Sequence, residues 1–288
     1  MKVCIFALFK HKKMKVGRKL PIKDMNIKLI ATDMDGTLLD SEKRMPKDFF
    51  DWIKEHDKVK FVIASGRQYY ALKRDFVPVH ERLIYIAENG ALIFHHDEII
   101  FYDEIAKDDV RACLDIINKM PYAKAVPCGA KSAYIENPDE HEWKVCSMFC
   151  EKLIKTDDMD KAIEDDIIVK IAIYYRNSDA EKHVDEFSDL PDNLARVLSG
   201  VSWIDISTKT ASKGAAMMAI QEKYGINSEE CMAFGDYFND VELLQACGES
   251  YCMANGHKDM FQYAKYIAPS NDDNGVMRVL NREGYTYG

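Results

Sequence analysis

Leu29-Ile30-Ala31-Thr32-Asp33-Met34-Asp35-Gly36-Thr37 is the stretch that decides the fold, because a short apolar run stops abruptly at two acids and a glycine. Three more apolar runs stop in the same manner, at Ser65-Gly66-Arg67, Glu88-Asn89-Gly90 and Gly235-Asp236. Apolar runs of this kind are typical of strands buried on both faces of a parallel sheet. Helical patterns over 47–56 and 213–224 supply crossovers between parallel strands. We therefore predict an α/β fold with a doubly wound, mostly parallel sheet, a Rossmann-like core.

The polar residues at the ends of these runs are expected to meet at one edge of the sheet. Doubly wound sheets bind ligands beyond the carboxyl ends of their strands. Four separate segments bring five polar side chains to that edge: Asp33, Asp35, Ser65, Asn89 and Asp236. Their convergence indicates a functional site more strongly than any one segment does.

The stretch between Glu104 and Gly200 has a different pattern, which predicts a second domain inserted into the first. Helical patterns cover 107–119, 140–153 and 179–188, and strand-like runs cover 132–136, 167–175 and 195–198. These strands do not end in acidic loops, so we expect an inserted α+β cap domain over 106–199. The core then comprises 25–105 and 200–288, and the chain returns to it at the strand 202–206.

Residues 1–24 form a basic extension, with eight Lys or Arg residues against one acid, Asp24. Its apolar run, 3–9, precedes most of these charges, whereas a secretory signal has its charges first. We expect a poorly ordered extension and a domain that begins at Met25, with a basic surface tether as the alternative.

Composition places the chain among ordinary globular proteins and excludes two classes of partner. It has 288 residues, 47% hydrophobic, and a net charge of −9, which becomes −16 once the +7 of residues 1–24 is set aside. An acidic body lacks the basic face of a nucleic-acid binder, so no nucleic acid is expected. No apolar run approaches the roughly 20 residues of a membrane span, so no membrane is expected either. Eight cysteines without zinc spacing are typical of free thiols, which predicts a cytoplasmic protein.

Asp33 and Asp35 are two residues apart, so in an extended segment both carboxylates point to the same side. Two acids this close repel each other unless a cation or a shared proton intervenes. Asp236 adds a third carboxylate, and Asp240 lies one helical turn beyond it. Clustered carboxylates favour Mg²⁺, which binds carboxylates, water and substrate phosphate. A calcium loop of the EF-hand type is excluded, because its glycine and glutamate are absent at positions six and twelve counted from Asp33.

Each segment taken alone also has an ordinary structural explanation. The stretch 33–37 suits a capped turn, Ser65 suits a helix N-cap, and Lys213 suits a solvated surface position. A helix N-terminus also binds anions, so Ser65 can serve both purposes. Arg67 and Asn89 border the expected site, where they either contact a leaving group or form an ion pair and a turn hydrogen bond.

Together, four segments resemble the motifs of the haloacid dehalogenase-like hydrolases: 33–39, 65–67, 213–214 and 235–240. The order and spacing are similar to the Cof-type branch with a type IIB cap. Only 32 residues separate Asp33 from Ser65, whereas 148 separate Ser65 from Lys213, and this second interval is where that branch carries its cap. The resemblance extends from Met25 to the C-terminus and includes the segment 88–91.

This resemblance implies roles for the acids. Asp33 would be the nucleophile that forms an aspartyl-phosphate, and Asp35 would protonate the leaving alcohol and then deprotonate the hydrolytic water. Mg²⁺ would bind the Asp33 carboxylate, the Asp35 backbone carbonyl and Asp236.

The resemblance also implies roles for the residues around the phosphate. Ser65, Lys213 and Asn239 would bind the phosphoryl group. Asp240 would orient Lys213 or a metal-bound water from behind.

These expectations predict an Mg²⁺-dependent phosphatase acting on small phosphorylated metabolites, sugar phosphates in particular. A phosphomutase of the phosphomannomutase type is one alternative, and a non-catalytic phosphate-binding module is another. No pattern in the cap names the substrate, and the sequence leaves the oligomeric state open.

Overall fold

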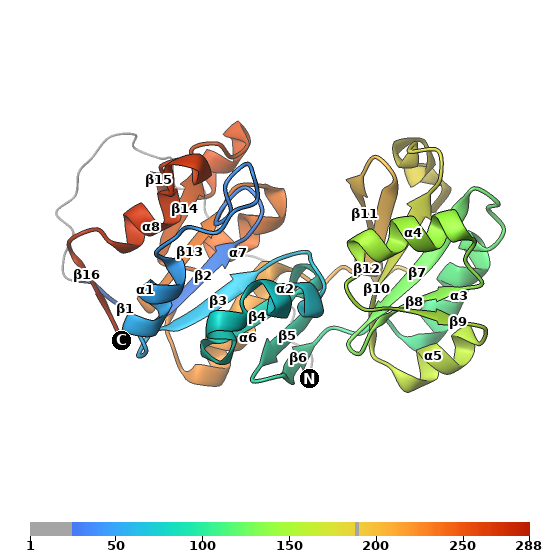
Figure 1. Cartoon of the computed structure of the whole chain (residues 1–288), viewed down its shortest axis with the longest axis horizontal. Coiled ribbons are helices and arrows are strands. Elements are labelled where there is room, and N and C mark those ends of the chain that lie inside the picture. Colours follow the sequence, from blue (N-terminus) through green and yellow to red (C-terminus); the bar gives the residue numbers. More distant parts are fainter. Residues whose placement is uncertain (1–24, 188–189) are drawn as a thin grey trace.

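The computed structural model describes residues 25–187 and 190–288, and Figure 1 shows them as two lobes joined by two chain segments. The larger lobe, the core, contains an eight-stranded and a two-stranded sheet. The smaller lobe, the cap, contains a six-stranded sheet. The basic extension predicted for 1–24 lies outside the described residues.

The core sheet has the strand order β15-β14-β13-β2-β3-β4-β5-β6. Neighbours from β15 to β4 are parallel, and β5 and β6 add an antiparallel hairpin at one edge. β2, β4 and β13 are buried along their whole length, which is why they appear in the sequence as unbroken apolar runs. The strands are β2 (Leu29–Asp33), β3 (Lys60–Ala64), β4 (Leu83–Ala87), β5 (Leu92–His95), β6 (Glu98–Tyr102), β13 (Cys231–Gly235), β14 (Glu249–Met253) and β15 (Tyr266–Ala268).

Helices cover both faces of this sheet, so the predicted doubly wound α/β fold is confirmed. One face packs against α1 (Phe49–Glu55), α2 (Tyr69–Asp75) and α8 (Gly275–Leu280). The other packs against α6 (Lys213–Tyr224) and α7 (Val241–Gln245). Alternate strand residues enter the two cores, for example Ile30 on the first face and Ala31 on the second.

The cap sheet has the strand order β11-β12-β10-β7-β8-β9. Helices α3 and α5 and the 3₁₀ helix η3 pack on one face of the sheet, and α4 packs on the other. The elements are α3 (Lys107–Ile117), β7 (Ala123–Gly129), β8 (Ala133–Glu136), α4 (Glu140–Phe149), β9 (Leu153–Thr156), α5 (Met159–Asp165), β10 (Ile168–Tyr175), η3 (Ala180–Phe187), β11 (Leu194–Gly200) and β12 (Trp203–Thr208).

Two details of the predicted cap are wrong. β12 was expected to return the chain to the core, but it pairs antiparallel with β10 and β11, so the cap continues through Thr208. Ile204 and Ile206 are buried while Asp205 between them is not, which is the alternation of a strand with one apolar face and not the pattern of the core strands. The helix expected over 179–188 is a 3₁₀ helix, and Ser188 lies outside the described residues.

The remaining elements are short. β1 (Met25–Ile27) pairs in parallel with β16 (Tyr285–Tyr287), which joins the first and last described residues of the core. Within the described residues no helix combines the length and apolar character needed to cross a bilayer, and the described cysteines are free thiols. The other 3₁₀ helices are η1 (Val77–Arg82), η2 (Glu88–Gly90), η4 (Ser228–Glu230), η5 (Phe238–Asp240), η6 (Lys258–Gln262) and η7 (Asn271–Asp273).

Candidate active site

Asp33 ends the central strand β2 at the carboxyl edge of the core sheet. Met34, the next residue, is fully buried in the apolar core, whereas Asp35 after it is partly exposed. Gly36 follows with φ of +87°, and a Cβ at this position would lie 2.5 Å from Asp236 Oδ2. This glycine therefore lets the loop after β2 pass directly beside the third acid.

Lys213 reaches Asp33 from the first turn of α6. Ser212 caps this helix by accepting a hydrogen bond from the Ala215 amide at 3.1 Å, which fixes where the helix begins. The Lys213 side chain is completely buried, and its Nζ donates to Asp33 Oδ1 and to Asp240 Oδ1, both at 2.6 Å. Taken alone, Lys213 suited a solvated surface position, but in the structure it is a buried cation of the site.

Asp236 and Asp240 complete an acidic cluster around this lysine. Asp236 follows β13, the parallel neighbour of β2, and its Oδ1 accepts a hydrogen bond from Thr37 at 3.0 Å. Asp240 Oδ2 accepts from the Asp236 amide at 2.9 Å, so Asp240 holds both the lysine and the acidic loop. One carboxylate oxygen each from Asp33, Asp236 and Asp240 lies within 4.8 Å of the other two.

This crowding changes the protonation of two of the acids. Burial, assisted by the Asp240 and Asp236 carboxylates and opposed by Lys213, raises the pKa of Asp33 to about 7. Burial and the Asp240 carboxylate raise the pKa of Asp236 to about 6. One lysine does not balance three clustered acids, so the site has excess negative charge near neutral pH.

The donor set fits a divalent cation of the Mg²⁺ type. Hard carboxylate oxygens are the ligands that Mg²⁺ takes from proteins, together with water and phosphate. Asp33 and Asp236 both meet this requirement, and their pKa values stay raised although Lys213 lies beside them, which is the result expected where a further positive charge would be accommodated. Asp240 is fully buried against Lys213, which places it on the buried side of the cluster.

Ser65, Asn89 and Asn239 form the neighbouring part of the edge. Ser65 follows β3 and is buried, and its Oγ accepts the Arg67 amide at 3.2 Å. The Asn89 amide donates to the Ser65 carbonyl at 3.0 Å, and Asn239 Nδ2 donates to Asn89 Oδ1 at 3.1 Å. The structure thus brings these three predicted residues together, on the strands and loops that flank Asp33.

Asp35 is held by two cations, only one of which was expected at the site. Arg67 donates from Nε and Nη2 to the two Asp35 oxygens at 2.8 and 2.7 Å, and Lys43 Nζ donates at 2.8 Å. Burial alone would raise the pKa of Asp35, but the bonds from Arg67 and Lys43 outweigh it and lower that pKa. Arg67 also contacts Asp75 at 3.0 Å, so in this structure it forms the ion pair that was the alternative to contact with a leaving group.

Lys43 and Thr37 were not predicted at the site. Thr37 belongs to the stretch that follows Asp33, where its hydroxyl could have been considered as a partner for an acid. Lys43 lies in an irregular loop with φ of +62°, and no periodic pattern indicates that it folds back onto Asp35.

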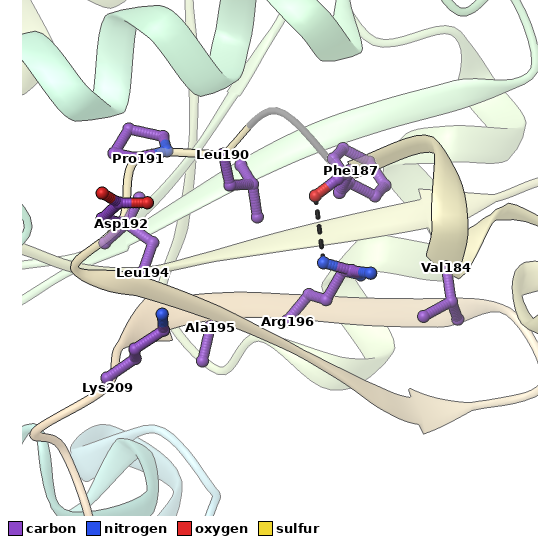
Figure 2. A pocket seen from close by; sticks show the side chains of 9 residues that line it. All are labelled: Val184, Phe187, Leu190, Pro191, Asp192, Leu194, Ala195, Arg196 and Lys209. Atoms are coloured by element: carbon purple, nitrogen blue, oxygen red, sulfur yellow. Dashed lines mark hydrogen bonds between the residues drawn. The ribbon is translucent and has the colours of Figure 1, made fainter.

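A hollow lies in the cap, apart from these residues (Figure 2). Its volume is about 470 Å³, and its lining residues belong to η3, β11 and the segments next to them. Arg196 in this hollow donates to the Phe187 carbonyl at 3.0 Å, which Figure 2 marks with a dashed line. None of the predicted site residues lines it, so it is separate from the acidic cluster.

Comparisons with known proteins show the family of this chain. The family model for haloacid dehalogenase-like hydrolases matches residues 30–280. The 5-amino-6-(5-phospho-D-ribitylamino)uracil phosphatase YbjI of Escherichia coli is 30% identical over 265 residues, which cover 90% of this chain and 96% of that protein. The crystal structure of SMU.1108c from Streptococcus mutans has a TM-score of 0.75 at 30% identity, covering 89% of this chain and 98% of that one. The subclass IIB sugar phosphatase BT4131 has a TM-score of 0.69 at 20% identity, with 88% and 97% coverage, and this shows a shared fold.

Proposed function

The chain belongs to the haloacid dehalogenase-like hydrolases, in the Cof-type branch and among the phosphomonoester hydrolases, and we propose that it releases phosphate through an aspartyl-phosphate intermediate with the help of Mg²⁺. The observation that carries this proposal is the buried chain Asp33–Lys213–Asp240 beside Asp236. These residues provide a nucleophile (Asp33), a cation (Lys213) and two further acids, and they lie at the edge where doubly wound sheets bind ligands. We also propose a cytoplasmic location, which its free thiols support.

In this mechanism Asp33 attacks phosphorus, so that a phosphorus–oxygen bond to Asp33 forms while the bond to the leaving alcohol breaks. Asp35 gives its proton to the leaving oxygen and later takes one from the water that releases phosphate from Asp33. Arg67 and Lys43 keep the pKa of Asp35 low in this structure, so Asp35 must first leave these contacts and take up a proton before it can act as the acid.

Lys213, Ser65 and Asn239 would bind the phosphoryl oxygens during both steps. Lys213 is suited to this role because Asp33 and Asp240 fix its ammonium group before substrate arrives. Asp33, the Asp35 backbone carbonyl and Asp236 would hold Mg²⁺, which supplies neutralisation of the phosphate charge when bound.

We propose phosphorylated sugars and polyols as the substrate class. Three curated relatives carry the name 5-amino-6-(5-phospho-D-ribitylamino)uracil phosphatase, which describes a phosphorylated polyol attached to a pyrimidine. The cap offers an aromatic pair that would suit such a ring: Phe149 is 62% exposed, and its ring centroid lies 5.1 Å from that of Trp203. Three residues beyond Phe149 the chain contacts the core, because the backbone of Lys152 exchanges two hydrogen bonds with the Gln68 side chain.

The test is a screen of phosphorylated metabolites with Mg²⁺ and with EDTA. The panel contains sugar phosphates, nucleotides, the ribitylaminouracil phosphate and p-nitrophenyl phosphate, with free phosphate and isomerised sugar phosphate both measured. We expect Mg²⁺-dependent release of free phosphate. Isomerised product without free phosphate would support a phosphomutase, and no turnover of any compound would support a binding module.

A further inference from the structure

Glu88 is a buried acid in a strained turn between the cap and the core. Glu88, Asn89 and Gly90 have φ values of +50°, +56° and +105°, three left-handed residues in succession. Left-handed backbone is uncommon outside glycine and is retained only where the surroundings impose it. The Glu88 side chain is 2% exposed, and its Oε2 has no hydrogen bond of standard geometry within the described part of the chain.

The cation that meets this acid comes from the cap. Lys170 lies on β10, and its Nζ is 2.6 Å from Glu88 Oε2 and 3.6 Å from Asp205 Oδ2 on β12. The Lys170 side chain is 13% exposed, so little water remains to replace it. The neighbouring cap residues Ala130 and Val169 pack into the apolar core of the larger lobe, which places the ion pair inside the contact between the lobes.

The turn that Lys170 holds is bonded directly to the phosphate side of the candidate site. The Glu88 amide donates to the Arg67 carbonyl at 3.1 Å, and the Asn89 amide donates to the Ser65 carbonyl at 3.0 Å. The Asn89 side chain accepts from Asn239 and fills the space beside Gly66, where a Cβ would lie 3.0 Å from it. A shift of the turn would therefore move Ser65 and Asn239 together.

We propose that Lys170 is a positioning residue: through its ion pair with Glu88, the cap sets the 88–90 turn and with it the phosphate-binding side chains of the core. The inference rests on the proposed function, because it assigns Ser65 and Asn239 to the phosphate. Two other hydrogen-bonded contacts between the lobes, among the described residues, are made by α2 and the residue before it and not by this turn. The Gln68–Lys152 bonds lie beside α2, and Tyr70 donates to the Ala130 carbonyl at 3.2 Å.

The experiment compares Lys170→Met, which removes the charge, with Lys170→Arg, which keeps it. Lys107→Met is the matched control, since Lys107 pairs with Glu164 at 2.7 Å within the cap and away from the turn. With p-nitrophenyl phosphate and Mg²⁺ we expect Lys170→Met to lose roughly 10–100-fold in kcat, because small displacements of positioning groups cost this much, with KM nearly unchanged. Lys170→Arg recovers most of the loss, and Lys107→Met stays at the wild-type value.

Hydrogen exchange supplies a readout that does not depend on turnover. In Lys170→Met the amides of 65–67 and 88–90 should exchange roughly tenfold faster, because the turn that orders them opens more often. Unchanged exchange at these amides, an unchanged kcat, or an equal loss in Lys107→Met would overturn the proposal. A wild-type protein that hydrolyses no phosphoester refutes the proposed function instead, and the exchange result then still decides whether Lys170 orders the turn.

Discussion

Replacing Asp33 with Asn removes the proposed nucleophile, and the structure also predicts that it stabilises the metal-free protein. Asn cannot form the phosphoryl ester, so phosphate release in Mg²⁺ should disappear. The stability effect has a separate cause. Asp33 is buried beside two other acids, and the neutral amide avoids the cost of an ionised carboxylate there.

The pKa of Asp33 sets the magnitude of this effect. Folding raises that pKa from 3.8 to about 7, so the folded state binds a proton more tightly than the unfolded state. The stability penalty is absent below pH 3.8, grows as pH rises, and is fully present above about pH 7. At about 1.36 kcal/mol for each unit of pKa, we expect a gain on the order of 2–4 kcal/mol for Asp33→Asn in EDTA at pH 8.

Two measurements test this reasoning. Phosphate release at pH 7 in Mg²⁺ tests the nucleophile, and thermal unfolding in EDTA at pH 8 and pH 5 tests the electrostatics. The Tm of Asp33→Asn should rise by about 5–10 °C at pH 8 and by much less at pH 5. Asp108→Asn, at a fully exposed acid of the cap, should match the wild type in both. Retained turnover would refute the nucleophile, and a lower Tm at pH 8 would refute the account of the acidic cluster.

Three further predictions follow from the same contacts. Lys213→Met should lower kcat by about 10²–10³-fold. It should also destabilise the fold by about 3–5 kcal/mol in urea unfolding, because it leaves two buried acids unpaired, and a loss of activity without a loss of stability would contradict the buried contacts. Mg²⁺ affinity measured by calorimetry should rise between pH 5 and pH 7, because Asp33 and Asp236 lose protons in this range, and an affinity independent of pH would exclude them as ligands. Gly90→Ala should unfold at a lower urea concentration than Gly225→Ala, since a Cβ at Gly90 overlaps the Ser212 carbonyl whereas a Cβ at Gly225 has open space. Equal urea midpoints for the two variants would refute the close approach of Gly90 to Ser212.

The core was predictable from sequence because its strands are buried on both faces. β2 and β13 therefore appear as unbroken apolar runs, and each ends where its polar loop begins. β12 was assigned to the wrong lobe because the residues of a strand do not by themselves indicate which other strand it pairs with. The alternation of Ile204, Asp205 and Ile206 did distinguish it, since it is typical of a sheet with one apolar face.

The site was predictable to the extent that strand ends determine it. The positions of Asp33 and Asp236 follow from neighbouring parallel strands, and that of Lys213 from the helix that follows its cap. The clamp of Arg67 and Lys43 on Asp35 was not predictable, because it depends on where an irregular loop folds and on which of several acids an arginine meets. Long flexible side chains have too many possible partners for spacing to choose among them.

The route of the chain through the two lobes has a consequence for synthesis on the ribosome. The central strand β2 needs β13, which is made about two hundred residues later, so three of the eight strands of the core sheet (β13, β14 and β15) are missing until translation is nearly complete. The cap is one uninterrupted segment and can fold as soon as Thr208 has emerged. We expect nascent chains that stop shortly after that residue to resist protease in the smaller lobe and to be cut in the larger one, and the opposite pattern would show that the core does not wait for its last strands.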